Sequence, residues 1–224
     1  HRAAKHKNLG GGQSKERTRD KLANVLNGLE SRSRIRFQKL RERCLNMRNI
    51  AHGVRGGQSN VSAEELRTPG LDRLLWVFLR LLYSQQGLLR FLEATDEDAI
   101  KAQLADQKAK EEKARADGDE RIIRSLTDAI ATSELRLENY ERAQKNAEFV
   151  EIELERIESK IQALTEMAVS SQDPDYISSQ VDSVADSMTQ TEEAIRDLHH
   201  ITGLDDVDST PDILETNLSE VIEA

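Results

Sequence analysis

The sequence predicts an all-α protein of elongated shape, in which long helices form an antiparallel coiled-coil hairpin. Apolar residues recur at alternating steps of three and four through most of the second half of the chain. Charged residues make up 33% of the 224 residues, aromatic residues make up 4%, and there are only 3 prolines. A narrow apolar seam is typical of helices that pack in pairs. So few aromatic residues leave little material for a thick globular core.

The apolar repeat has two runs, separated by the turn Asp173-Pro174-Asp175. The first run spans residues 123–168, with one short step between Ala147 and Val150, and it includes polar positions such as Gln144. Asp173 is expected to cap the second run and Pro174 to open it. We expect the runs to be the two arms of one hairpin over residues 119–202. Its predicted seam consists of Leu126, Ile130, Leu137, Tyr140, Leu154, Ile157, Ile161, Leu164, Ile177, Val181, Val184, Met188, Ile195 and Leu198.

Start and stop signals place the elements of the N-terminal part. Residues 1–13 are basic and rich in glycine, which predicts a flexible arm. Ser14 is expected to cap a basic helix over residues 14–55. Residues 56–68 contain two adjacent glycines and are expected to form a linker.

The elements on either side of the hairpin follow from similar signals. Pro69 is expected to open a helix over residues 69–118 whose first part is apolar around most of its circumference and whose second part is charged. Gly118 is a good C-terminal stop, and Asp119 is a good cap for the next helix. Residues 203–224 are expected to form an acidic tail with a short helix starting at Pro211.

Charge is divided unequally along the chain. Residues 1–55 contain 15 Lys and Arg against 4 Asp and Glu, a net of +11, and the other residues contain 17 against 37, a net of -20. From Ser171 onward, Arg196 is the only basic residue beside 14 acidic ones. This division predicts that one end of the chain meets an anionic surface, or that the two ends meet each other.

The single cysteine, Cys44, excludes an internal disulfide framework and favours a reducing compartment, so we expect a cytoplasmic location. The longest apolar stretch, Leu71–Leu92, is interrupted by charged residues and predicts no membrane span. Because the sequence begins with His1 rather than methionine, we expect the native start to lie upstream. Whether a membrane span precedes His1 stays open.

Signals for catalysis or metal binding are weak. The five histidines include no pair at the i, i+4 spacing of helical zinc ligands. The run Gly10–Gly12 before Ser14 and Lys15 lacks the spacing of a phosphate-binding loop. Cys44 occupies a seam position, where a buried apolar role is expected rather than a nucleophilic one. We therefore expect no enzymatic activity, no metal and no cofactor.

The basic helix is the strongest functional signal. Its cations are Arg32, Arg34, Arg36, Lys39, Arg41, Arg43 and Arg48. Such a helix is typical of a segment that lies on anionic lipid. Nucleic-acid phosphates would be bound by the same charges, and pairing with the acidic hairpin or exposure to water would also account for them. These interpretations stay open, although Phe37 is the only aromatic residue nearby and stacking on single-stranded bases is disfavoured.

The stretch Leu135–Leu198, which begins LRLENYERAQ and contains the turn QDPDY, resembles the cytoplasmic coiled-coil region of uncharacterised bacterial proteins that carry membrane helices upstream. The resemblance extends over residues 71–202 and lies in two long helices joined at a short Asp-Pro turn. It implies a bacterial, membrane-associated scaffold that faces the cytoplasm, and it brings no catalytic residues. In outline, the chain is also similar to phage-shock and ESCRT-III-type membrane-remodelling proteins.

Together these features predict a non-enzymatic coiled-coil scaffold or regulatory module at the cytoplasmic face of a membrane. It is expected to self-associate or to bind protein partners through its helical seams, with the basic helix on anionic lipid. The alternatives are a nucleic-acid-associated helical protein that uses the basic region, and a membrane-remodelling helical protein.

Overall fold

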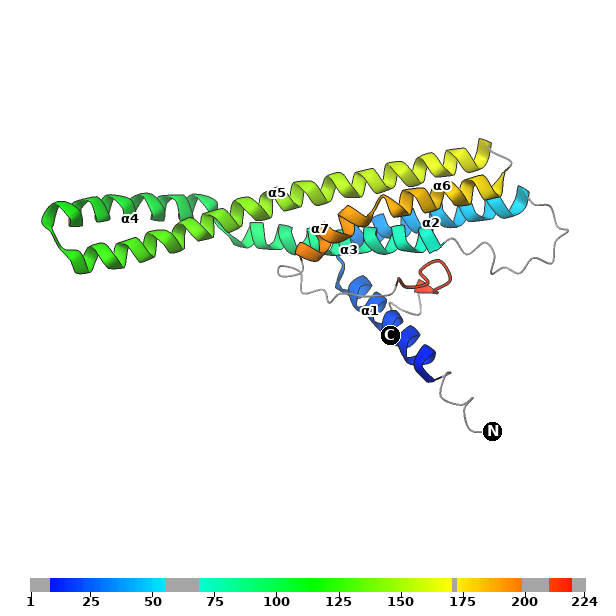
Figure 1. Ribbon diagram of the computed structural model, residues 1–224, viewed down its shortest axis with the longest axis horizontal. Helices are drawn as coiled ribbons and strands as arrows, with labels where there is room; N and C mark the ends of the chain where they lie inside the picture. The colour runs from blue at the N-terminus through cyan, green and yellow to red at the C-terminus, as the bar shows by residue number, and fades with distance from the viewer. Residues whose placement is uncertain (1–8, 55–68, 171–172, 199–209, 219–224) are drawn as a thin grey trace. The chain divides into compact units, whose positions relative to one another are not determined.

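The computed structural model describes residues 9–54, 69–170, 173–198 and 210–218, and of residues 9–17, 51–54 and 174 it describes the backbone alone. These ranges form α-helices and one short segment with a turn, and they contain no β-strand (Figure 1). The predicted all-α class is therefore confirmed. The chain forms two compact units, unit 1 (residues 1–86 and 150–224) and unit 2 (residues 87–149).

The basic region of unit 1 contains two helices, α1 (Leu9–Gly28) and α2 (Ser31–Val54), rather than the single helix predicted over residues 14–55. Helix α1 already begins within the predicted arm 1–13. The chain breaks after Gly28, and Gln86 binds both ends of the break: its Nε2 donates to Gly28 O (2.9 Å) and its Oε1 accepts from Glu30 N (2.7 Å). A Cβ at Gly28 would lie 2.8 Å from Tyr83 Cε2, so a larger residue there would require the Tyr83 side chain to move. Residues 1–8 and the predicted linker lie outside the described residues.

Helix α3 (Pro69–Ala94) begins at Pro69, as predicted, but the single helix predicted over residues 69–118 is wrong, because the chain breaks after Ala94 and Asp96 caps a new helix by accepting from Ala99 N. Within unit 1, α3 is buried on nearly all sides. Every residue from 74 to 82 is buried, including Phe78 and Trp76. At Gly70 the backbone of α3 lies close to the helix that contains Val181. A Cβ at Gly70 would lie 3.0 Å from Val181 Cγ1. A helix that is apolar around its circumference thus forms the centre of this unit's core, as the sequence indicates.

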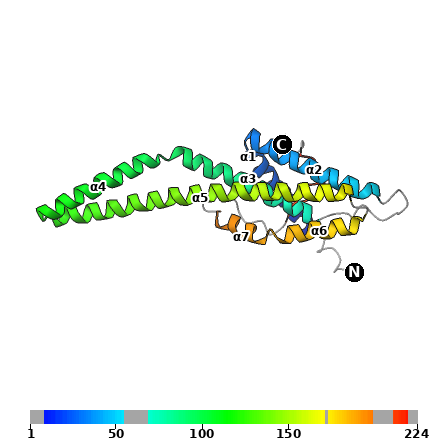
Figure 2. The same ribbon diagram turned by 90° about the horizontal axis from the view of Figure 1, so that it is seen from above.

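Within unit 1, residues 150–170 of the long helix α5 (Glu120–Ser170) pair with α6 (Pro174–Asp186) and α7 (Thr189–Asp197), as Figure 2 shows. Asp173 caps α6, accepting from the backbone N–H groups of Asp175 and Tyr176, as predicted. Lys160 Nζ donates to Ser187 Oγ (2.8 Å) and Arg156 Nη2 donates to Thr191 Oγ1 (2.8 Å), which makes the pairing antiparallel. The buried seam contains Val150, Leu154, Ile157, Ile161, Leu164, Ala168, Ile177, Val181, Met188, Thr191, Ile195 and Leu198.

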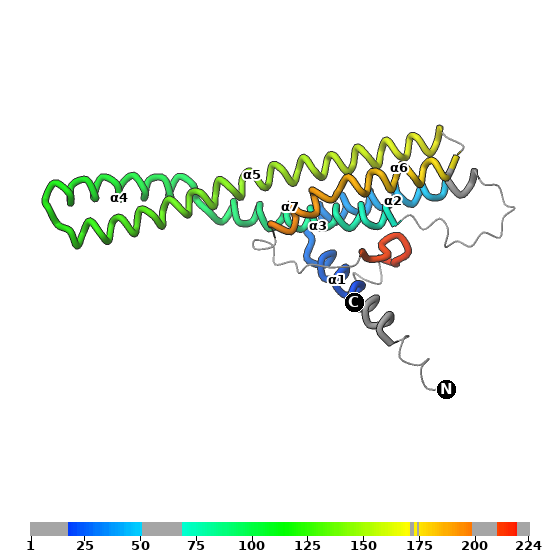
Figure 3. The backbone as a smooth tube through the Cα atoms, in the orientation of Figure 1, coloured from blue at the N-terminus to red at the C-terminus, as the bar shows by residue number. Residues whose placement is uncertain are grey.

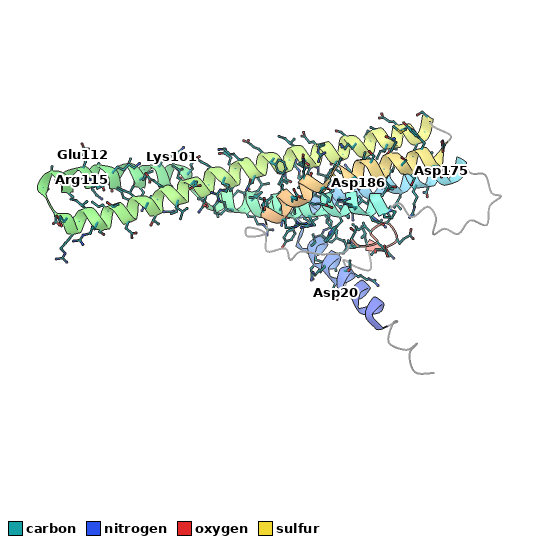
Figure 4. The ribbon with its side chains drawn as sticks, in the orientation of Figure 1. Asp20, Lys101, Glu112, Arg115, Asp175 and Asp186 are labelled. Atoms are coloured by element: carbon teal, nitrogen blue, oxygen red, sulfur yellow. The ribbon has the colours of Figure 1, made fainter. Side chains whose placement is uncertain are left out.

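Helix α3 is also linked to α7. Arg73 makes a two-pronged ion pair with Glu192, from Nε at 2.9 Å and from Nη2 at 2.7 Å. Its Nη1 donates to Asp186 (3.2 Å), which is labelled in Figure 4. Hydrogen bonding to Glu192 raises the pKa of Arg73. The bend after α6, at Ser187 and Met188, divides the predicted return helix and lies beside these contacts.

Unit 2 contains the last residues of α3, from Gly87 on, and an antiparallel hairpin of α4 (Glu97–Asp117) and residues 120–149 of α5. Gly118 ends α4 in the left-handed region (φ 74), and the carboxylate of Asp119 accepts from the first N–H groups of α5, as predicted. Ser133 Oγ donates to Gln107 Oε1 (2.8 Å), and Lys108 pairs with Glu134 (2.8 Å). The smooth backbone trace in Figure 3 shows the two helices side by side.

The partner predicted for the first part of α5 is therefore wrong. Residues 120–149 pair with α4, and only the second part of α5 pairs with the return helices. Helix α4 has its own seam at steps of four and three, formed by Ile100, Leu104, Gln107, Glu111 and Ala114, all buried or half-buried. Two of these five positions are polar, which conceals the repeat in the sequence.

The register of α5 within unit 2 also differs from the prediction. Ala143 is buried, with 2% of its surface exposed, whereas Gln144 is exposed. Two consecutive steps of three therefore lead from Leu137 through Tyr140 to Ala143, and the second of them lies seven residues before the short step predicted between Ala147 and Val150. A local excess of three-residue steps overwinds a coiled coil, and here it lies inside the hairpin. The predicted seam residues Leu126, Leu137, Tyr140 and Val184 are half-buried.

The C-terminal segment (Thr210–Leu218) belongs to unit 1, and the helix start predicted at Pro211 is wrong, because residues 213–215 form a turn and the first helical residue is Leu218. Ile213 N donates to Pro211 O (2.9 Å), and Thr216 Oγ1 donates to Asp212 O (2.6 Å), which closes the turn. Ile213 and Leu214 are buried, with 0% and 5% exposed. The segment thus docks through its apolar pair. Residues 203–209 and 219–224 of the predicted acidic tail lie outside the described residues.

Candidate functional site on the basic helix

Arg36 of α2 is bound by two carboxylates of α5. Its Nε and Nη2 donate to Glu158 at 2.9 and 3.0 Å, and its Nη1 donates to Glu151 at 3.2 Å. Its guanidinium also lies 5.9 Å from the ring centre of Phe78. Hydrogen bonding to Glu158 raises the pKa of Arg36. Burial raises the pKa of Glu151, but hydrogen bonds from Arg36 and Gln85 outweigh it and lower that pKa overall. Arg36 therefore joins two helices of unit 1.

Arg41 and Arg48, farther along α2, bind the C-terminal segment. Arg41 donates to three main-chain carbonyls, those of Ile213 (3.1 Å), Leu214 (3.2 Å) and Thr216 (2.8 Å). Arg48 forms an ion pair with Glu215. The basic helix thus meets part of the acidic tail within one molecule, which was one of the interpretations left open by the sequence.

Asp72 of α3 completes the contact with this segment. Its Oδ1 accepts from Leu214 N at 2.9 Å. Burial raises the pKa of Asp72, and burial together with the neighbouring Arg48 lowers the pKa of Arg41. Burial raises the pKa of the Cys44 thiol to about 12, so the thiol is uncharged and unsuited to act as a nucleophile. We call Arg41, Arg48 and Asp72 the anchor residues.

Arg34 has a local structural contact. Its Nη2 donates to Leu29 O at 2.9 Å, just after the last turn of α1. Four of the seven cations proposed to bind an anionic surface, Arg34, Arg36, Arg41 and Arg48, therefore contact other parts of the same chain.

The other three cations, Arg32, Lys39 and Arg43, are exposed and form no ion pair or hydrogen bond with the described residues. Their spacing of seven and four residues places them on one face of α2. They cover about 16 Å of the helix at about 1.5 Å per residue. We call these three residues the basic stripe.

The sequence identified the cations of this region but missed Asp72 and the main-chain groups of residues 213–216. In the sequence, Asp72 is one of the charged residues that interrupt the apolar stretch Leu71–Leu92. A carboxylate within such a run, in the first turn of a buried helix, is a signal for a polar partner. The identity of that partner is not encoded locally, because it lies more than a hundred residues farther along the chain.

Other candidate chemistry is limited in the described part of the chain. No group of three or more His, Cys, Asp or Glu residues there could hold a metal ion. The histidine side chains lie outside the described residues. None of the described helices is both long and apolar enough to cross a membrane.

The outer faces of unit 2 carry ion pairs within each helix. Glu97 pairs with Lys101 (2.6 Å), Asp106 pairs with Lys110 (2.6 Å), and Glu138 pairs with Arg142 (2.6 Å). Lys101, Glu112 and Arg115 of α4, which are labelled in Figure 4, are all exposed. Pairs at i, i+4 stabilise a helix that is surrounded by water.

Comparison of the chain with protein-family models, with curated proteins and with solved structures finds no match.

Proposed function

We propose that this protein is a non-enzymatic helical scaffold that binds protein partners along the hairpin of unit 2. The observation that carries the proposal is the construction of this hairpin, in which α4 and α5 share one narrow seam. The large apolar side chains buried in that seam are few, with Ile100 and Ile130 the main ones. Most of the residues of unit 2 are therefore available to a partner.

The exposed surface of the hairpin suits a helical partner. Ile122 and Leu135 of α5 are 50% and 56% exposed, among charged residues that are already paired within their own helices. Apolar anchors surrounded by charge are typical of helix-to-helix recognition, in which the apolar contacts supply affinity and the charges supply orientation.

In vivo photo-crosslinking tests this proposal. A photoreactive amino acid at Ile122 or Leu135 of the full chain should give discrete cross-linked products, which mass spectrometry would identify. The control position is Val169, which is 70% exposed but belongs to unit 1. Products of equal yield and identity at Val169, or no products at the two hairpin positions, would contradict the proposal.

A second candidate function, binding to an anionic surface, is favoured by the basic stripe. We propose that Arg32, Lys39 and Arg43 place α2 on the anionic cytoplasmic face of a membrane. Each cation near such a surface contributes about 1 kcal/mol, so the three together would change membrane affinity by roughly a hundredfold at low salt. Ile35, 53% exposed on the same helix, would add an apolar contact.

Vesicle co-sedimentation separates this function from nucleic-acid binding. The full chain should bind phosphatidylcholine vesicles only when phosphatidylserine is included, and the Arg32→Ala/Lys39→Ala/Arg43→Ala variant should not bind. The matched control, Lys113→Ala/Arg121→Ala/Lys145→Ala, removes three exposed cations of unit 2 and should bind normally. Binding to duplex DNA in place of vesicles would support the nucleic-acid alternative, and equal loss in both variants would contradict a specific role of the stripe.

A further inference from the structure

The contacts of the C-terminal segment have the form of peptide recognition. Arg41 of α2 donates hydrogen bonds to three main-chain carbonyls of the segment, and Asp72 of α3 accepts a hydrogen bond from one of its main-chain N–H groups. The main chain of the segment is thus held by four hydrogen bonds. Side chains of the segment add an apolar pair, Ile213 and Leu214, and one carboxylate, Glu215, which pairs with Arg48. Main-chain bonds give affinity, and such side-chain contacts select a sequence.

The charges on the two sides are complementary. The anchor residues carry two positive charges and one negative charge. The segment carries Asp212 and Glu215 and has no basic residue. Arg41 and Asp72 are both half-buried, and among the described residues their hydrogen bonds go to the segment alone. Departure of the segment would remove these partners from two desolvated charges, which is costly, so the site requires an occupant of this chemistry.

The segment is joined to α7 by residues 199–209, a connection of 11 residues. An extended chain spans at most about 3.5 Å per residue, so the connection reaches up to about 38 Å. This length allows the segment to bind the anchor residues of another molecule without a change in the helices.

We propose that the anchor residues form a peptide site that binds the C-terminal segment of a second copy of this chain, so that copies associate by exchanging residues 210–218. The second copy supplies the same apolar pair, the same carboxylate and the same main-chain groups as the occupant in the structure. Exchange of identical elements is a low-cost route to association. Within one molecule the segment competes at a millimolar effective concentration, so exchange becomes measurable when docking within the molecule is prevented.

Complementation between two full-length variants tests this proposal. The first, Ile213→Asp/Leu214→Asp, keeps the anchor residues but has a segment that cannot dock. The second, Arg41→Ala, keeps the segment but lacks three of the bonds that hold it. Each variant alone should be a monomer in analytical ultracentrifugation, and an equimolar mixture should form a one-to-one complex.

The matched control is Arg43→Ala, which removes an exposed cation two residues away and leaves the anchor residues intact. Its own segment stays docked, so its mixture with the Ile213→Asp/Leu214→Asp variant should give a complex at least tenfold weaker. A mixture of the two complementary variants that sediments as monomers, with the helical circular dichroism of the wild type, would overturn the proposal. So would equal complex formation with the control.

A charge-reversal pair gives an independent test in case Arg41→Ala fails to fold. Arg48 and Glu215 are partly exposed, so Arg48→Glu and Glu215→Arg are expected to fold. Each reversal repels the segment within its own chain, but each chain complements the other at both contacts. The mixture should therefore dimerise, while the single chain with both reversals should be a monomer. Dimers of either variant alone, or no dimer in the mixture, would overturn the exchange.

Discussion

Arg36 illustrates how a cation of the basic helix contributes to the fold. Two of its nitrogens bind Glu158, a third binds Glu151, and the guanidinium lies over the Phe78 ring. A planar guanidinium can make these contacts at once, whereas a lysine ammonium cannot. The same chemistry that would bind phosphate on a membrane is here used between α2 and α5.

We predict that Arg36→Ala destabilises the protein by about 2 kcal/mol, because it removes charged hydrogen bonds and leaves Glu158 without its partner. Urea unfolding followed by circular dichroism would measure this. Arg43→Ala, on the same helix but exposed, should change stability by less than about 0.5 kcal/mol. Equal effects of the two substitutions would contradict the contacts described for Arg36.

Asp72 gives a prediction for pH dependence. Burial raises its pKa in the folded protein above the ordinary value of 3.8. The folded chain therefore binds this proton more tightly than the unfolded chain, and the stabilisation present below pH 3.8 is lost as pH rises through the raised pKa. Asp72→Asn removes the charge and keeps an oxygen for Leu214 N–H.

The free energy of unfolding of Asp72→Asn should therefore increase relative to that of the wild type between pH 4 and pH 7, as urea unfolding at both pH values would measure. If the wild type instead became more stable relative to the variant over this range, the raised pKa would be wrong.

At the scale of elements, a polar cluster lies inside the seam between α5 and α7. Thr191, with 2% of its surface exposed, donates to Glu153 Oε2 (2.5 Å) and accepts from Arg156 Nη2 (2.8 Å). Arg156 also pairs with Glu153, which is 9% exposed. A polar group in an apolar seam is satisfied in one register, because a shift by a helical turn would separate the partners.

Thr191→Val should thus destabilise the protein by about 1 to 3 kcal/mol, since it leaves the buried carboxylate of Glu153 without one partner. Thr132→Val on the exposed face of α5 is the matched control, because Thr132 bonds only to the carbonyl of Asp128 in its own helix. Chemical unfolding of both variants would measure the difference. A stabilising effect of Thr191→Val would show that the cluster does not contribute to the pairing.

Helix boundaries that depend on the backbone preference of a single residue were predicted correctly from the sequence in most cases. Pro69, Asp173, Gly118 and Asp119 act at the positions expected from their backbone preferences. The break between α1 and α2 was missed, although Gly28 and Ser31 are residue types that commonly end and begin helices. The bonds of Gln86 to both sides of the break could not be predicted, because Gln86 is distant in sequence. The seam of α4 was missed because Gln107 and Glu111 occupy two of its positions.

At the scale of the whole molecule, α5 serves two cores. Its residues 120–149 belong to unit 2, and its residues 150–170 belong to unit 1. Most seam positions of the first part are half-buried, whereas Val150, Leu154, Ile157 and Ile161 of the second part are fully buried. Periodicity alone predicts a seam along the whole helix and does not say which partner lies on it.

This difference in burial predicts uneven hydrogen exchange along a continuous helix. Amides of residues 120–149 should exchange faster than those of residues 150–170, because opening the hairpin of unit 2 exposes less apolar surface. Mass spectrometry of deuterated peptides would measure this. Uniform protection along α5 would contradict the division into two units.

The candidate site was predictable in composition and not in arrangement. The seven cations were recognised from the sequence, but the sequence does not show which of them are exposed and which bind other parts of the chain. The structure separates Arg36, Arg41 and Arg48, which bind other parts of the chain, from the exposed Arg32 and Lys39. That separation depends on contacts with residues 151–158 and 213–216, whose positions only folding determines.

Thiol cross-linking in a Cys44→Ala background tests most directly the central claim that α5 has two partners. A short bifunctional reagent should link Gln107→Cys to Ser133→Cys, and Lys160→Cys to Ser187→Cys, whose wild-type side chains hydrogen-bond at 2.8 Å in each pair. It should not link Leu137→Cys to Met188→Cys, since Met188 contacts Arg156, about 28 Å along the helix from Leu137. Linkage of the Leu137 and Met188 pair, with no linkage of the Gln107 and Ser133 pair, would contradict the two-partner arrangement.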